Sequence, residues 1–129
     1  MGYLNQCKQH VIDTLPDYEG QELEACDLGM TLTESENATG SWYCNTYKAE
    51  KDLDSWGRSI VGDFIEDYKS EFGEKPQWDA YTDPENFHCL MMIIGVEKII
   101  NESPIIQEYW NKEIKLTKSM INKIINSLE

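Results

Sequence analysis

Apolar residues recur every three to four positions over residues 3–15, 56–72 and 116–128, and this spacing predicts three amphipathic helices. The middle helix is the most regular, since one stripe takes in every fourth residue: Trp56, Ile60, Phe64, Tyr68 and Phe72. Gly73 stands where this helix should end, and the last helix should begin near Thr117.

Residues 84–101 are apolar on nearly every side, which is the pattern of a buried helix. Asp83 can serve as its N-cap, and Pro84 suits the first helical position. A short helix over residues 104–111 should follow, capped by Ser103. We expect the apolar helix to be the central one, around which the others pack.

Residues 21–36 fit two patterns. Leu28, Met30 and Leu32 alternate as they would in a strand, whereas Ala25, Leu28 and Leu32 also share one face of a helix. Helix is the favoured interpretation of this segment.

The remaining segments are short. The sequence predicts a turn at residues 37–40, an extended segment near 41–45, a helix that is capped by Asn45 or Thr46 and runs to about Leu53, and a loop over 74–83. Together these patterns predict an all-α fold, a compact single domain at residues 1–129 with about six helices around the central apolar one.

The chain shows no membrane-spanning or export pattern. Its longest apolar run, residues 89–96, is far shorter than the roughly 20 residues that cross a bilayer. The N-terminus has no basic region leading into an apolar stretch, so no signal peptide is expected. We therefore expect a soluble cytoplasmic protein without membrane association, whose four cysteines stay reduced.

The charge changes this picture, because the net value of −13 is unevenly distributed along the chain. Residues 1–97 contain 20 acidic and 6 basic residues, while residues 98–129 contain 4 acidic and 5 basic ones. Between Gln9 and Tyr47 there are no Lys or Arg residues but eight carboxylates: Asp13, Asp17, Glu19, Glu22, Glu24, Asp27, Glu34 and Glu36. Such a field repels nucleic acid and anionic membranes and attracts basic protein surfaces, so direct nucleic-acid binding is not expected.

Residues that could bind a metal or act as nucleophiles are present without a supporting motif. The candidates are Cys7, His10, Cys26, Cys44, His88 and Cys89. They do not form the two tight pairs that are usual in structural zinc sites, and neither a phosphate-binding glycine loop nor a nucleophile elbow occurs. We predict a protein without metal or cofactor that is not an enzyme.

Two features suggest binding instead. The acidic run can place several carboxylates on one surface, spaced like the phosphates of a nucleic acid, although acidity that serves solubility alone is the competing interpretation. Trp42 and Trp78 lie in polar, irregular segments, where a tryptophan either anchors an interface or covers a small core. The candidate partner-binding residues are Asp17, Glu19, Glu22, Glu24, Asp27, Glu34, Glu36, Trp42 and Trp78.

Residues 32–49, together with Glu71-Phe72-Gly73 and Pro84-Glu85-Asn86-Phe87, carry a resemblance to known proteins. The chain resembles a family of small acidic proteins encoded by bacteriophages, prophages and plasmids, over residues 20–100. The resemblance transfers no catalytic residues. It implies an accessory gene of a mobile element, a context in which small acidic proteins often act as anti-CRISPR or antirestriction factors in the host cytoplasm.

These observations lead to one hypothesis and two alternatives. The leading hypothesis is a phage inhibitor that mimics DNA and binds a basic, nucleic-acid-binding host protein. The first alternative is a structural or homo-oligomeric phage module, such as a homodimer joined along the apolar stripe at residues 116–128. The second is a metal-binding protein or enzyme that uses the Cys and His residues.

Overall fold

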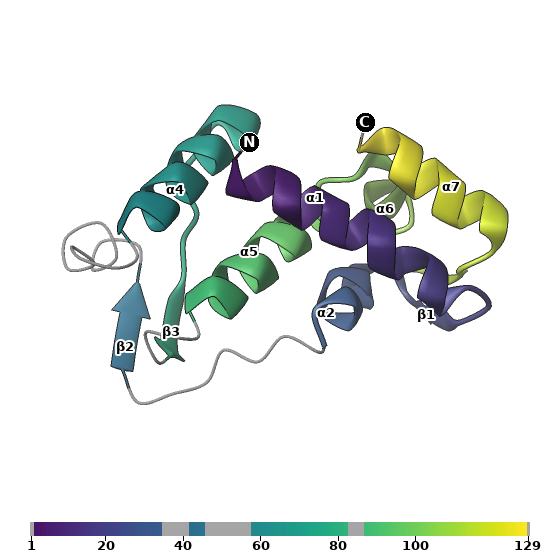
Figure 1. The fold of residues 1–129 in the computed structure, drawn as a ribbon. Helices are drawn as coiled ribbons and strands as arrows, with labels where there is room; N and C mark the ends of the chain where they lie inside the picture. Colours follow the sequence, from purple (N-terminus) through teal and green to yellow (C-terminus); the bar gives the residue numbers. More distant parts are fainter. Residues whose placement is uncertain (1, 35–41, 46–57, 83–86, 129) are drawn as a thin grey trace. The chain divides into compact units, whose positions relative to one another are not determined.

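The computed structural model describes residues 2–34, 42–45, 58–82 and 87–128, and most of these residues are helical (Figure 1). The described α-helices are α1 (Tyr3–Thr14), α2 (Leu28–Leu32), α4 (Arg58–Phe72), α5 (Phe87–Asn101), α6 (Pro104–Glu108) and α7 (Lys118–Ser127). The single-turn 3-10 helices are η1 (Leu15–Tyr18) and η2 (Ala25–Asp27). The predicted helical class is therefore confirmed.

Four short strands accompany the helices and form two antiparallel ribbons. The first ribbon pairs β1 (Glu22–Glu24) with β4 (Glu113–Lys115), and the second pairs β2 (Trp42–Asn45) with β3 (Asp79–Thr82). Both ribbons join segments that are far apart in the sequence, so no hairpin turn signals them.

The chain divides into two compact units. Unit 1 comprises residues 1–6 and 36–95, and unit 2 comprises residues 7–35 and 96–129. α1 and α5 each contribute residues to both units. The expected single domain with α5 at its centre stays a prediction.

Local signals set the ends of the long helices. Gly73 has a φ of +77°, and its N–H donates to the Lys69 carbonyl oxygen at 2.8 Å, which ends α4 as expected. The Thr117 hydroxyl accepts the Met120 N–H at 3.1 Å and caps α7. These boundaries confirm what the sequence pattern predicts.

The prediction of a helix over residues 21–36 is wrong for its first half. Glu22–Glu24 is a strand, because it pairs with Glu113–Lys115. The Leu116 N–H donates to the Gln21 carbonyl oxygen at 2.9 Å, extending the ladder at one end. Only Leu28–Leu32 forms an α-helix, so a long-range pairing overrides the local helical pattern.

The predicted loop over residues 74–83 is also partly wrong, because Asp79–Thr82 forms β3. Its partner Trp42–Asn45 confirms the extended segment expected near residues 41–45. The turn at residues 37–40, the helix over 46–53 and the start of the apolar helix at Asp83 and Pro84 lie outside the described residues.

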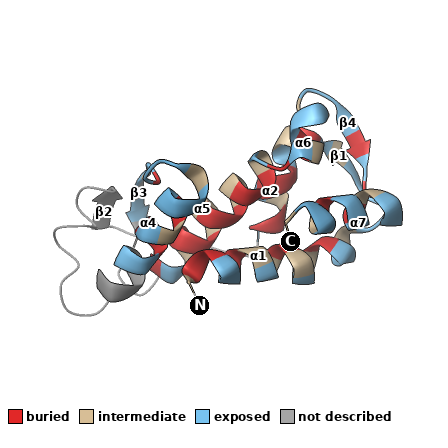
Figure 2. Cartoon of the chain, turned by 90° about the horizontal axis from the view of Figure 1, so that it is seen from above, coloured by how far each residue is buried: buried red, intermediate tan, exposed pale blue. Residues whose placement is uncertain are grey.

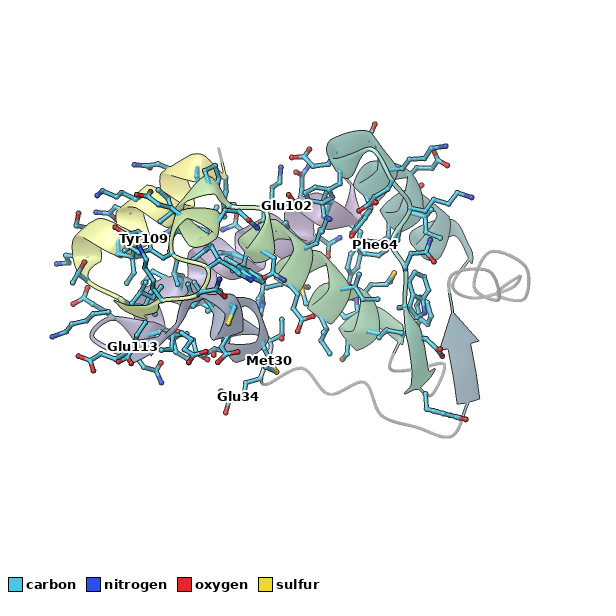
Figure 3. The ribbon with its side chains drawn as sticks, turned by 180° about the vertical axis from the view of Figure 1, so that it is seen from behind. Met30, Glu34, Phe64, Glu102, Tyr109 and Glu113 are labelled. Carbon is cyan, nitrogen blue, oxygen red and sulfur yellow. The ribbon has the colours of Figure 1, made fainter. Side chains whose placement is uncertain are left out.

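Aromatic rings form much of the core of unit 1. The Tyr3 and Phe64 ring centroids are 5.7 Å apart, and Phe64 and Tyr68 are 6.0 Å apart, in edge-on arrangements. Phe64 is completely buried, and Figure 3 labels it on α4. The helical stripe predicted for α4 therefore serves packing.

Aliphatic residues form the core of unit 2, and α2 approaches the last turns of α5 there. A Cβ added at Gly29 would lie 3.1 Å from the Glu97 Cα, so the two backbones approach more closely than a larger residue would readily permit. Along α7 buried and exposed residues alternate, as Figure 2 shows by colour, because Ile121 and Ile124 face the core. None of the described helices is long and apolar enough to cross a membrane.

Candidate protein-binding surface

The predicted partner-binding residues separate between the two units. Unit 2 contains six of them, and all six are exposed: Asp17, Glu19, Glu22, Glu24, Asp27 and Glu34. Trp78 belongs to unit 1, and Trp42 lies in β2 of that unit. Glu36 lies outside the described residues. The six described acids and the two tryptophans therefore belong to different units.

The β1–β4 ribbon has an apolar face and a charged face. Leu23 is paired with the buried Ile114, and both side chains lie on the same face. Since successive side chains of a strand point to opposite faces, the neighbouring residues lie on the solvent face. There Glu22 is opposite Lys115, and Glu24 is opposite Glu113, so one cross-strand pair is favourable and the other is repulsive.

The repulsive end of the ribbon continues into η2. One oxygen of Glu24, one oxygen of Asp27 and the sulfur of Cys26 all lie within 4.8 Å of one another. The Cys26 Sγ is 3.8 Å from the Glu24 Oε2 and 3.9 Å from the Asp27 Oδ1. Glu24 thus has two acidic neighbours, since its carboxylate lies close to that of Asp27 and its backbone is paired with that of Glu113 across the ribbon.

These carboxylates also act on the Cys26 thiol. Its pKa is raised above the ordinary value, first by desolvation and then by the negative charges of Asp27 and Glu24. A raised pKa reduces the fraction of thiolate at neutral pH, and the thiolate is the form that attacks electrophiles and binds soft metals. Desolvation and the negative charges of Asp27 and Glu24 therefore make Cys26 a poor nucleophile.

The acidic segment is not isolated in the folded chain, because the lysine-bearing C-terminal segment runs beside it. The Gly20 N–H donates to the Leu116 carbonyl oxygen at 2.7 Å, and the Ala25 N–H donates to the Lys112 carbonyl oxygen at 3.0 Å. The charge is consequently distributed more evenly between the two units than it is along the sequence. By residue count unit 1 carries 12 acidic and 5 basic residues, and unit 2 carries 12 acidic and 6 basic residues.

Sequence reasoning missed Glu113 as a member of this surface. The signal available was a single apolar residue between two charged ones, Glu113-Ile114-Lys115, which is the alternation of a half-buried strand. A run of three residues is too short to distinguish a strand from a loop. Pairing with β1, which sequence spacing cannot predict, makes this segment a strand.

The structure describes the side chain of one of the two candidate tryptophans, Trp78. The Trp78 ring lies 5.9 Å from the ring of Phe87, which is 3% exposed, and Trp78 itself is half-buried. This contact supports the alternative in which Trp78 covers a core, instead of anchoring a partner. The side chain of Trp42 lies outside the described part of the structure.

The six Cys and His candidates are divided between the two units, and the side chain of Cys44 lies outside the described part of the structure. Cys7, His10 and Cys26 belong to unit 2, whereas Cys44, His88 and Cys89 belong to unit 1. Within the described residues, the one set of three side chains close enough to share an ion is Glu24, Cys26 and Asp27. The sequence-derived ligand set therefore gains no support from the geometry.

Individual contacts show what several of these residues do. Burial raises the pKa of the Cys7 thiol to about 12, so this residue packs as a neutral group. The His10 Nε2 lies 3.0 Å from the Leu32 carbonyl oxygen, which can only accept, so Nε2 carries a proton and joins α1 to α2.

His88 is fixed by Tyr3. The Tyr3 hydroxyl donates to the His88 carbonyl oxygen at 2.9 Å, and its oxygen lies 2.8 Å from the His88 Nδ1. The Tyr3 hydroxyl has one proton, which it donates to the carbonyl oxygen. The hydroxyl oxygen therefore accepts a hydrogen bond from Nδ1, so Nδ1 carries a proton. This pair attaches the start of α1 to the start of α5 within unit 1.

The apolar stripe of the last helix is largely used inside unit 2. Leu116 and Ile124 are completely buried, and Ile121 is 3% exposed. Met120, Ile125 and Leu128 are half-buried. Most of the stripe proposed as a dimer seam is therefore already covered by the chain itself.

Comparisons with known proteins add no relative from which a site could be transferred. No family model, curated protein or solved structure matches the chain. The resemblance to small acidic phage and plasmid proteins thus stays a prediction from the sequence.

Proposed function

We propose that the chain is a non-enzymatic protein-binding factor, an inhibitor of a phage or other mobile element whose acidic surface engages a basic, nucleic-acid-handling host protein. Carboxylates that replace phosphates can occupy a cleft shaped for DNA or RNA, and the encounter is accelerated by long-range attraction. No step of this function requires a bound cofactor or a nucleophile.

The observation that carries the proposal is that Glu24 lies close to the carboxylate of Asp27 and opposite Glu113 across the ribbon. These carboxylates are exposed, and within the described residues none of them forms an ion pair. Glu24 faces Glu113 directly across the ribbon, an arrangement that is unfavourable for folding. The positive charges of a basic partner would offset the repulsion between Glu24 and Glu113. This arrangement of charge therefore favours binding of such a partner.

A charge-reversal experiment tests the proposal. The binding variant carries Glu24→Lys, Asp27→Lys and Glu113→Lys, and the control variant carries Asp63→Lys, Glu66→Lys and Asp79→Lys in unit 1, where all three acids are exposed. Both variants change the net charge equally. Each is used to capture proteins from bacterial lysate at low and at high salt, with mass-spectrometric detection.

The unmodified protein and the control variant should retain a basic, nucleic-acid-binding protein at low salt and lose it at high salt. The binding variant should not retain it. Equal losses in both variants would mean that only net charge matters, and retention by the binding variant would disprove the proposed surface. Circular dichroism of the variants establishes that each remains helical.

A further inference from the structure

Met30 interrupts the amphipathic pattern of α2. The helix buries Leu28, Gly29 and Leu32, but Met30 is 61% exposed. Among the large hydrophobic residues in the described ranges, only Met30 and Tyr81 are so exposed. A polar residue at position 30 would suit the helix equally well, so the folding of unit 2 does not account for the methionine.

Carboxylates border this methionine on both sides along the chain. Asp27 precedes Met30 by three residues, a spacing that brings side chains to the same side of a helical segment, and Glu34 follows in the turn after α2. Figure 3 labels Met30 on α2 and Glu34 where the chain leaves that helix. Asp27 in turn belongs to the group with Glu24 and Cys26.

We infer that Glu24, Asp27, Met30 and Glu34, here called the α2 edge, bind a basic peptide segment that carries an apolar side chain. The inference rests on the proposed function and specifies the chemistry of the partner. Lys or Arg side chains of such a segment would contact the unpaired carboxylates. Its apolar side chain would cover Met30.

Methionine suits this role because its unbranched, polarizable side chain adapts to differently shaped apolar partners. A partner that offered only positive charge, such as a site that binds phosphates alone, would leave Met30 in water. The α2 edge therefore distinguishes a basic amphipathic segment from a purely cationic one.

The experiment compares two synthetic peptides with the full-length protein at low salt. Both consist of lysines around one central residue, which is leucine in the first peptide and glycine in the second, so their charges are equal. The methionine methyl groups of the protein are labelled with carbon-13, and Met30→Gln identifies the Met30 signal. Affinities are measured by titration of the same samples.

The leucine peptide should bind about fivefold to tenfold more tightly than the glycine peptide, because it covers the Met30 side chain. The Met30 methyl signal should shift only with the leucine peptide. Met30→Gln should remove the difference between the affinities for the two peptides. Tyr81→Gln is the matched control, since Tyr81 is also 61% exposed but lies in unit 1, and it should preserve the difference.

The outcomes separate this inference from the proposed function. Equal binding of both peptides with an unmoved Met30 signal would overturn the α2 edge and leave salt-sensitive binding of basic partners intact. Failure of both peptides to bind would contradict the two proposals together. A Met30 signal that shifts with protein concentration before any peptide is added would show that a second copy of the chain covers the edge, which also overturns the inference.

Discussion

The two sides of α2 differ in what their residues contact. On the inner side Leu28 is completely buried, and Gly29 lies against the backbone of Glu97. On the outer side Met30 is exposed, as are Asp27 just before the helix and Glu34 just after it. The helix has only five residues, so its stability depends on the inner contacts and not on its own hydrogen bonds. The outer residues are therefore available for binding at little cost to the fold.

The largest effect on stability should appear when a substitution on the inner side of α2 is compared with one on the outer side. Leu28→Ala removes a completely buried side chain and should lower the free energy of unfolding by about 2–5 kcal/mol. Met30→Ala removes an exposed side chain and should change it by less than about 0.5 kcal/mol. Urea denaturation of both variants measures the difference, and similar losses in the two would contradict the distinction between the sides.

A smaller, pH-dependent effect should come from Glu97, which lies behind the inner side. Burial raises the pKa of the Glu97 carboxyl above its ordinary value of 4.5, because its charged form is desolvated. The folded state then binds more protons than the unfolded state between 4.5 and the raised value, so stability falls as the pH rises through that interval.

Glu97→Gln removes this penalty, since the amide stays neutral. The variant should be more stable than the unmodified protein at neutral pH, and the difference should vanish once the pH is well below 4.5. Glu102→Gln is the control, because Glu102 is exposed and forms an ion pair with Lys98 at 2.7 Å. That substitution should be neutral or slightly destabilising at neutral pH. A gain from Glu97→Gln that persists at low pH would refute the explanation.

The smallest effect should come from the charged ribbon beside the outer side. Glu113→Lys replaces the repulsive pair with Glu24 by an attractive one, and it should raise the free energy of unfolding by about 0.2–1 kcal/mol. Added salt should reduce this gain by screening both pairs. Lys115→Glu, which makes the pair with Glu22 repulsive, should have the opposite sign. No change in either variant would show that the ribbon charges are fully screened by solvent.

Prediction from the sequence succeeded where a helix is long enough to show its own period. The stripe that includes Phe64, Tyr68 and Phe72 predicted α4, and Gly73 predicted its end. The same method failed at Glu22–Glu24, where a segment that also fits a helix is a strand. Three residues contain too little of any period to show which structure they adopt.

The candidate site was predicted in part. The sequence identified Glu24 and Asp27 as members of an acidic surface, but it placed Glu113 in the nearly neutral C-terminal segment, residues 98–129. Only the antiparallel register brings Glu113 opposite Glu24. The favoured helical interpretation leaves Met30 off the face shared by Ala25, Leu28 and Leu32, but only the structure shows that its side chain is exposed. Trp78 was proposed as an anchor, and its contact with Phe87 favours packing instead.

By itself the sequence determined the helical class, the end of α4, the start of α7 and the excess of negative charge, because the helical period, these two caps and the ionisable groups are local properties. The tertiary structure decided which strands pair, which acids meet and which lysines run beside them. Strand pairing depends on hydrogen bonds between distant residues, and an electrostatic field depends on distances through space. Neither is recorded in the order of the residues along the chain.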